Sequence, residues 1–294
     1  MSNAKLKNFS RFGLFLAAFL WGVSFVLMKN VLTNVQPFYI LAIRFCGAAL
    51  ILLPACAKKL KKLDKSYLIG GALMGAALLL SYVFQTYGLQ RTTPGKNAFL
   101  TSAYCVMAPF LYWVYKKKRP DRYNVAAAFM CLFGIGLISL DGDLRIGAGD
   151  ALTLGCGFFF AVHIIVTEKY VGARDPVALA MLQFATAGII ALLAAIILEP
   201  LPRLATASDI WSIVFLTVVC TAICLLLQVF GQKYTPPSQA AVIMTLESVF
   251  GAISSVILLR EVITPRLIAG FALTFAAVII SETKLAFIKK ARVH

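Results

Sequence analysis

Apolar runs of about 18 residues or more recur along the whole of this 294-residue chain, and they constrain its fold more than any other feature. A helix of about 20 apolar residues crosses the hydrocarbon core of a bilayer. The composition agrees, because 61% of the residues are hydrophobic and 14% are charged, against about 45–50% and about 25% in soluble domains. A soluble fold would lack the polar surface to cover such a chain, so we predict an all-α integral membrane protein.

Ten segments are long and apolar enough to be transmembrane helices. They cover residues 11–32, 38–57, 66–89, 96–115, 122–140, 149–170, 176–199, 209–232, 238–259 and 264–283. The connections are short and contain helix-breaking residues, as in Thr93-Pro94-Gly95. Because no connection is long enough to form a soluble domain, we expect the protein to act within the bilayer.

Lysine and arginine are distributed unevenly over the connections and give the chain a net charge of +16. Twenty of them fall on the same side as the two termini, seven fall on the opposite side, and Arg44 lies within a span. Cytoplasmic segments of membrane proteins are enriched in positive charge, so we predict a multi-pass protein of the cytoplasmic (inner) membrane with both termini in the cytoplasm. The basic residues form short clusters such as Lys116–Arg119 rather than one groove, and we expect no nucleic-acid partner.

The two halves of the chain resemble each other. Residues 25–45 align with residues 164–184, and residues 87–98 align with residues 230–241, with prolines at matching helix entries. We therefore predict two five-helix repeats, residues 1–145 with helices 1–5 and residues 146–294 with helices 6–10; a chance alignment of helical hairpins is the alternative. An odd number of spans per unit inverts the second unit, and inverted repeats supply inward-open and outward-open packings around a midplane site.

Several motifs resemble those of the drug/metabolite transporter (DMT) superfamily, EamA type. Leu20–Phe25, which reads L-W-G-V-S-F, is similar to the opening signature of that family. Arg44-Phe45 resembles its R-F pair in the second helix. Leu246–Phe250, followed by Leu258–Glu261, is similar to its L-E-P-V-F and L-L-G-E pattern in the ninth helix. The resemblance covers essentially the whole chain and implies ten helices and the transport of small metabolites.

The chain departs from the family pattern at identifiable positions. Ser248 replaces the proline and Arg260 replaces the glycine of the ninth-helix motif. In the first half, Tyr104 and Lys118 stand where the second half has Glu247 and Glu261. These departures leave the identity of the substrate open.

Glu247 is the strongest candidate for a transport residue. It lies about 13–14 Å from the start of span 238–259 at 1.5 Å per residue, near the midplane. A carboxylate at this depth is unfavourable unless it is paired, hydrated or protonated. We predict that Glu247 contacts substrate or carries a proton, and the alternative is a hydrogen-bonded glutamate that holds its helix to a neighbour.

The repeat places Trp21 and Ser24 over Phe160 and His163, and each pair is three residues apart on one helix face. An aromatic beside a polar group on two related helices predicts a pocket wall for planar or amphipathic solutes. The candidate central cavity also takes polar residues from the third and fourth spans, namely Tyr82, Gln85 and Tyr104. Any of these residues can alternatively pack against or hydrogen-bond a neighbouring helix.

Two further groups carry alternative interpretations. Arg44 can bind a substrate carboxylate, or it can have a structural role and snorkel towards the membrane surface. Lys29 and Glu168 occupy related positions near opposite membrane faces, where we expect interfacial anchors. The small-residue motif Gly71-x-x-x-Gly75 predicts close helix packing.

We predict a secondary active transporter that exports small metabolites, amino acids or related amphipathic compounds, by alternating access, with protons as the candidate coupling ion. A nucleotide-sugar-like exchanger, an intramembrane enzyme and a passive channel are the alternatives. The sequence contains no P-loop, H-E-x-x-H or C-x-x-C motif, so we expect no enzymatic activity, no cofactor and no metal. The expected partners are a small-molecule substrate and membrane lipid, and the expected state is a monomer or weak dimer.

Overall fold

The computed structural model describes residues 3–60, 64–117, 119–139, 146–172, 174–202, 206–235 and 237–284. Lys118 and the predicted end of the first unit at residue 145 lie outside these ranges. Within them the chain forms twelve α-helices and one π-helix, η1. The elements are α1 (Asn3–Val31), α2 (Pro37–Leu60), α3 (Lys65–Arg91), α4 (Pro94–Thr101), α5 (Tyr104–Lys116), α6 (Arg122–Ser139), α7 (Ala148–Val171), α8 (Pro176–Leu198), α9 (Ala207–Phe215), η1 (Leu216–Ile223), α10 (Cys224–Tyr234), α11 (Pro237–Leu259) and α12 (Pro265–Thr283).

These elements combine into ten spans of the described chain. Helices α4 and α5 together form one span, and α9, η1 and α10 together form another. Seven spans are long and apolar enough to cross a membrane on length and composition, and three shorter apolar helices lie within α6, α11 and α12. The prediction of an all-α membrane protein with ten transmembrane helices is therefore confirmed.

Helix starts follow from residues at their N-termini. Thr93, Asp175 and Thr264 each accept a hydrogen bond from a backbone N–H of the first helical turn, and a proline follows each of them. A short polar side chain satisfies an otherwise unpaired donor, and proline has none to lose at this position. The cap therefore explains one proline of each pair that agrees between the halves, Pro94 in the first half and Pro176 in the second.

Hydrogen bonds at the two ends of α3 show that the halves are inverted. The end of α1 lies beside the end of α3, where Lys29 Nζ donates to the carbonyls of Leu89 (2.6 Å) and Thr92 (2.9 Å). The connection between α7 and α8 is the repeat equivalent of the one between α1 and α2. It lies beside the start of α3 instead, with Arg174 bonded to Ser66. Equivalent segments therefore meet opposite ends of the same helix.

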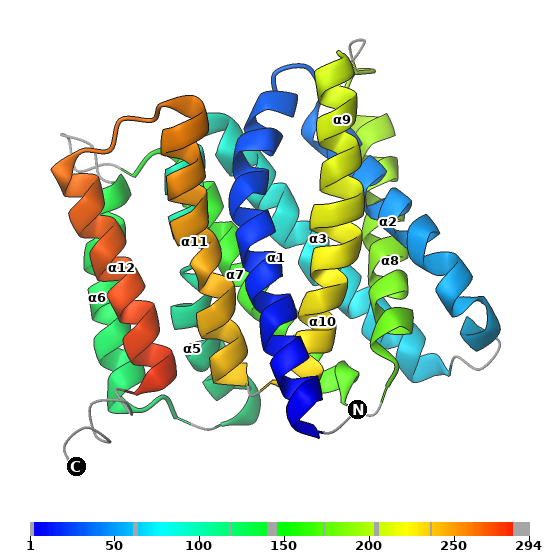
Figure 1. The fold of residues 1–294 in the computed structure, drawn as a ribbon, viewed down its shortest axis with the longest axis horizontal. Coiled ribbons are helices and arrows are strands. Elements are labelled where there is room, and N and C mark those ends of the chain that lie inside the picture. Colours follow the sequence, from blue (N-terminus) through cyan, green and yellow to red (C-terminus); the bar gives the residue numbers. More distant parts are fainter. Residues whose placement is uncertain are drawn as a thin grey trace.

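Helix packing follows the same pseudo-two-fold relationship. Helix α2 packs against its repeat mate α8 and α6 packs against its mate α12, and these pairs occupy the two ends of the bundle (Figure 1). Helix α3 packs against α7, and their repeat mates α10 and α1 also pack against each other. In the same way, α1 packs against α11, and their repeat mates α7 and α5 are in contact. The predicted inverted repeats are thus confirmed.

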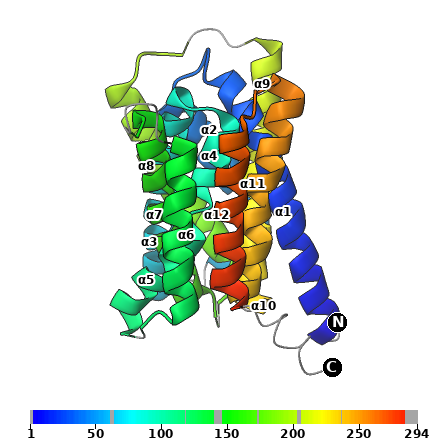
Figure 2. The ribbon, with the colours of Figure 1, turned by 90° about the vertical axis from the view of Figure 1, so that its left-hand side faces the viewer.

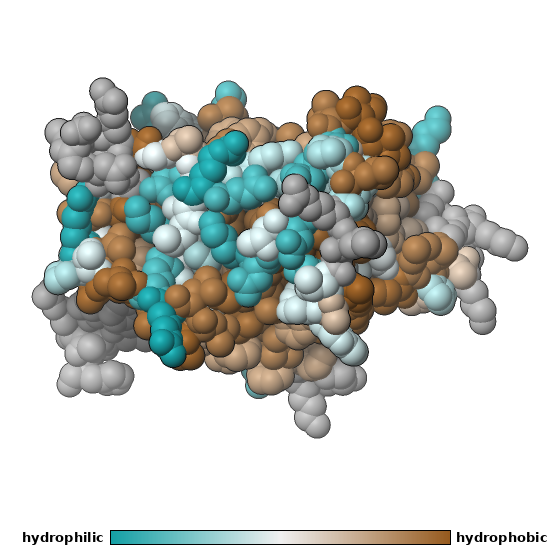
Figure 3. Space-filling view, turned by 90° about the horizontal axis from the view of Figure 1, so that it is seen from above, coloured by the Kyte–Doolittle hydropathy of each residue, from teal (hydrophilic) through white to brown (hydrophobic). Residues whose placement is uncertain are grey.

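The two faces of the bundle are named by helix ends. Helix α1 begins and α12 ends at the lower face, and α9 begins at the upper face (Figures 1 and 2). Viewed from above, hydrophilic residues gather over the middle of the upper face and hydrophobic residues lie around them (Figure 3). Large apolar side chains on the sides are exposed, such as Phe133 (70%) and Ile197 (76%). Lipid is the solvent that suits such a perimeter.

Two predicted helices are not regular. The segment predicted at 96–115 breaks at Ser102 and Ala103, and the segment predicted at 209–232 contains η1. In η1, Thr221 Oγ1 donates to the Leu216 carbonyl (2.7 Å) and Thr217 Oγ1 donates to Ile213 (2.7 Å). Such bonds from hydroxyls to preceding carbonyls distort a helix, and π-segments frequently occur at functional sites.

Candidate central binding site

A small cavity of about 30 Å³ lies inside the bundle. Its walls come from both halves of the chain, and the lining residues are Trp21, Ser24, Phe25, Met28, Arg44, Ser81, Tyr82, Gln85, Thr86, Leu89, Thr101, Phe160 and Glu247. This volume holds about one water molecule, whereas ligand pockets measure about 300–1,000 Å³. The helices must therefore separate before a metabolite can enter.

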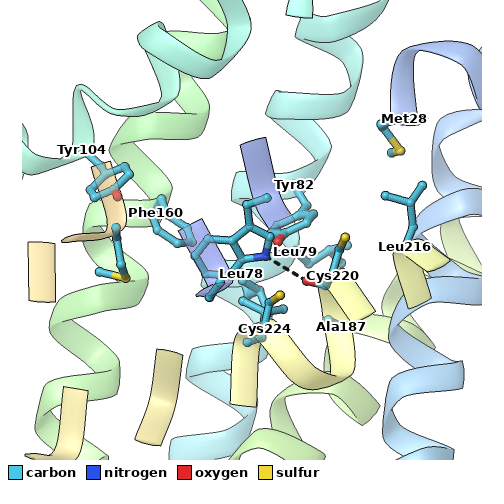
Figure 4. Packing of buried hydrophobic residues seen from close by; sticks show 14 of the residues in the cluster. Met28, Leu78, Leu79, Tyr82, Tyr104, Phe160, Ala187, Leu216, Cys220 and Cys224 are labelled. Carbon is cyan, nitrogen blue, oxygen red and sulfur yellow. Dashed lines mark hydrogen bonds between the residues drawn. The ribbon is translucent and has the colours of Figure 1, made fainter. Parts of the chain in front are cut away.

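Most of the predicted cavity residues meet here. Those that line the cavity are Trp21, Ser24, Arg44, Tyr82, Gln85, Phe160 and Glu247. Tyr104 and His163 lie behind the wall, with ring centroids 4.9 Å and 5.6 Å from that of Phe160; Figure 4 shows Tyr104 beside Phe160. Seven of the predicted residues thus form part of the cavity wall, and Tyr104 and His163 pack behind it against Phe160.

Several lining residues were missed by the sequence prediction. Met28 follows Ser24 by four residues on α1, and Thr86 and Leu89 follow Tyr82 by four and seven residues on α3. These are the spacings of one helix face. Extending the predicted residues by helical periodicity would have found them.

Trp21 connects α1 to the π-helix. Its Nε1 donates to the backbone carbonyl of Cys220 at 2.8 Å, the dashed line to Cys220 in Figure 4. Cys220 lies within η1, and the Trp21 side chain is 4% exposed. The indole also meets Phe160 edge to face, with centroids 6.4 Å apart. Trp21 therefore contacts both its repeat mate Phe160 on α7 and the span that contains η1.

Arg44 is held inside the bundle and does not snorkel. Its side chain is 3% exposed, its Nε donates to Thr221 Oγ1 at 2.9 Å, and its guanidinium lies 5.0 Å from the centroid of the Tyr82 ring. The alternative that Arg44 reaches the membrane surface is therefore wrong, because hydroxyl and aromatic partners hold it at the cavity. A guanidinium carries five N–H donors, so some remain for an anionic group.

Glu247 presents a carboxyl group to the cavity from α11. Its side chain is 5% exposed, and its Oε1 has no hydrogen-bond partner among the described residues. The neighbouring Ser248 hydroxyl donates to the Thr245 carbonyl at 2.7 Å. An ionised carboxylate in this place needs a cation or a proton as its partner.

Acidic residues of the second half close the upper face against the first half. Glu199 accepts from the Phe38 N–H (3.0 Å) and the Tyr87 hydroxyl (2.9 Å). Glu261 accepts from the Thr93 hydroxyl and from the Gly95 N–H (3.3 Å). With the Lys29 bonds to the end of α3, these contacts tie together the helix ends above the cavity. Lys29, predicted as an interfacial anchor, lies among these helix ends. Glu168, predicted as its counterpart at the other face, lies near the end of α7 and accepts a hydrogen bond from the Tyr112 hydroxyl (3.1 Å).

Comparisons with known proteins agree with this architecture. The model of the EamA-like transporter family matches residues 9–140 and again residues 147–283. Two Archaeoglobus fulgidus proteins named "Uncharacterized transporter" are similar over most of their lengths. The first is 34% identical, and the match covers 93% of this chain and 85% of the relative. The second is 24% identical, and the match covers 92% of this chain and 96% of the relative.

One solved crystal structure of a protein has the same fold. It matches with a TM-score of 0.71 and 16% sequence identity, over 95% of this chain and 98% of its own. At this identity the likeness concerns the fold alone. The two family matches and the 34% identical relative, together with the inverted ten-helix bundle and its central cavity, show that the chain belongs to the EamA-like transporter family of the drug/metabolite transporter superfamily.

Proposed function

We propose that this chain is a secondary active transporter that exports small amphipathic metabolites, amino acids or related compounds, by alternating access. The observation that carries the proposal is Glu247, a buried carboxyl group with an unpartnered oxygen in a cavity at mid-bundle. Aromatic Trp21 and Phe160 supply stacking surface there, and Arg44 supplies cationic donors. An amino acid presents complementary ammonium, carboxylate and apolar groups.

Proton coupling fits the same residue. Glu247 can hold a proton when the cavity lacks solute and release it when a cationic group of the solute takes its place. The excess of Lys and Arg on the side of the termini supports a cytoplasmic-membrane protein with both termini inside.

A multiply charged anion such as a nucleotide sugar is a poorer fit. Among the described residues that line the cavity, Arg44 is the one cation, and Glu247 faces the same space. Several phosphate charges would lack partners and would meet a carboxylate. Exchange of such anions is therefore the less favoured candidate.

Reconstitution into liposomes tests the proposal. Radiolabelled amino acids, nucleobases and amphipathic amines are offered with and without an imposed pH gradient, and the trapped solute is identified chemically. We expect at least one solute to accumulate unchanged and to show counterflow. Chemically altered solute would point to an enzyme, and flux without saturation or counterflow would point to a channel.

The Glu247→Gln variant tests the coupling residue. We expect it to lose pH-driven accumulation while counterflow of the same solute continues, because a neutral amide carries no exchangeable proton. Glu168→Gln is the matched control, since Glu168 is exposed and accepts a hydrogen bond from the Tyr112 hydroxyl (3.1 Å), away from the cavity lining. Wild-type pH-dependent accumulation in Glu247→Gln would end this assignment.

A further inference from the structure

Three polar side chains of the second half are completely buried on helices that meet, because α10 packs against both α7 and α8. His163 on α7, Gln183 on α8 and Gln228 on α10 are each 0% exposed. His163 Nε2 and Gln183 Oε1 are 3.0 Å apart. Within the part of the chain that the structure describes, His163 Nδ1, Gln183 Nε2 and both amide atoms of Gln228 have no hydrogen-bond partner. Unpaired buried polar atoms are rare and unfavourable, so this concentration needs a reason.

The repeat supplies the reason. The alignment that places residues 25–45 over 164–184 also places Ser24 on His163 and Arg44 on Gln183, and the alignment of residues 87–98 extends to place Gln85 on Gln228. Ser24, Arg44 and Gln85 all line the central cavity. One set therefore faces the cavity, while the equivalent set of the other unit is enclosed in protein.

Contacts where the units meet support this pairing. Phe45 and its repeat mate Phe184 stack with centroids 6.4 Å apart and planes 26° apart. Trp21 and its mate Phe160 also touch. Related residues in mutual contact lie close to the pseudo-two-fold axis, so the two polar sets are on opposite sides of that axis.

A separate apolar cluster lies between the enclosed set and the lower face. It comprises Met74, Val171, Leu179 and Val229, which come from α3, α7, α8 and α10 and are at most 3% exposed. Leu179 precedes Gln183 by one turn on α8, which begins at the lower face, and Val171 follows His163 by two turns on α7, which ends there. We call these four residues the lower plug.

We propose that His163, Gln183 and Gln228 form a second polar half-site that lines a cavity open to the lower face once the lower plug separates. The inference rests on the proposed alternating access and deepens it. In that state, water and the polar end of the solute hydrogen-bond the atoms that are unpaired here. The half-site offers neutral amide and imidazole groups where the first offers Arg44, so a solute carboxylate meets a guanidinium on the upper side alone.

Cysteine labelling tests the half-site without a known solute. In a background free of the seven native cysteines, none of which forms a disulfide with another described cysteine, Gln228→Cys is compared with its repeat mate Gln85→Cys. Ala127→Cys is the control, because Ala127 is 0% exposed on α6, which packs against α12 rather than at the axis. A membrane-impermeant maleimide is applied to vesicles of each orientation, and full labelling after denaturation checks that each cysteine is present.

We expect Gln228→Cys to react from the face at which α12 ends, Gln85→Cys from the opposite face, and Ala127→Cys from neither. Adding Leu179→Ala should raise the labelling rate of Gln228→Cys by about tenfold, because the truncation weakens the plug packing. Protection of Gln228→Cys from both sides, or labelling from the same side as Gln85→Cys, overturns the half-site.

The labelling and transport assays distinguish a failure of the half-site from a failure of the carrier assignment. If solute accumulates while Gln228→Cys stays protected from both sides, the half-site is wrong and the carrier assignment stands. If Gln228→Cys labels as expected but no solute accumulates, the half-site stands and the proposed function fails for those solutes.

Discussion

The crossing of α3 over α8 provides a quantitative test of the packing. A Cβ atom added to Gly75 would lie 2.5 Å from the Gln183 carbonyl oxygen and 2.8 Å from Thr186 Cβ. Both distances are shorter than real Cβ atoms accept, and the carbonyl belongs to a helix backbone that cannot rotate away. In Gly75→Ala the two helices must therefore move apart. Overpacking of this kind costs about 1–3 kcal/mol.

That cost translates into a measurable loss of thermal stability. At roughly 2–4 °C per kcal/mol, we expect the unfolding midpoint of Gly75→Ala in detergent to fall by roughly 2–12 °C. The midpoint is read from the folded peak remaining on size-exclusion chromatography after heating. Gly172→Ala is the matched control, because no atom lies within 4 Å of its added Cβ.

The comparison between Gly75→Ala and Gly172→Ala tests whether α3 and α8 approach each other closely. Gly172→Ala should keep the midpoint of the parent protein or raise it by roughly 1–4 °C, since an unstrained Gly→Ala substitution stabilises by about 0.4–1 kcal/mol. Equal midpoints for Gly75→Ala and Gly172→Ala would refute the close approach of α3 and α8.

Two further predictions concern contacts above and beside the cavity. Trp21→Phe replaces the indole with a smaller aromatic ring and leaves the Cys220 carbonyl without its 2.8 Å donor, so we expect a loss of about 1–3 kcal/mol, measured by the same thermal assay; an unchanged midpoint would contradict the bond. Glu261→Gln weakens the charge-assisted bonds to Thr93 and Gly95 and should speed labelling of Gln85→Cys from the upper face several-fold, whereas Glu168→Gln should leave that rate unchanged.

The fold could be predicted because lipid leaves a chain few alternatives. Every backbone polar group in the hydrocarbon must be paired internally, so each long apolar run had to be a helix. The prolines at residues 94 and 176 marked helix starts for a local reason, since each follows a capping side chain. The inversion followed from counting an odd number of spans in each half.

The site was predicted in part, at positions that the repeat relates in pairs. Trp21 and Phe160 were chosen because they align, and they do touch. The two alternatives for Arg44, a substrate carboxylate or a structural role with snorkelling, stayed open because its partner Thr221 is 177 residues away, a separation at which no local sequence pattern operates. The π-helix was missed for a related reason. Threonine is common in helices, and the spacing of Thr217 and Thr221 does not indicate that their hydroxyls bond preceding carbonyls and distort the helix.

The lower closure combines hydrogen bonds with the apolar lower plug, and this combination bears on the proposed alternating-access cycle. The Asp175 N–H donates to the Tyr67 hydroxyl (2.9 Å) and Lys233 Nζ donates to the Arg174 carbonyl (2.8 Å), and such bonds exchange for bonds to water at small net cost. The lower plug is apolar, and exposing it to water costs about 25 cal/mol for each Å². A solute at the lower face must offset the plug by binding the second half-site better when it is open, which gives those enclosed polar groups their role in the cycle.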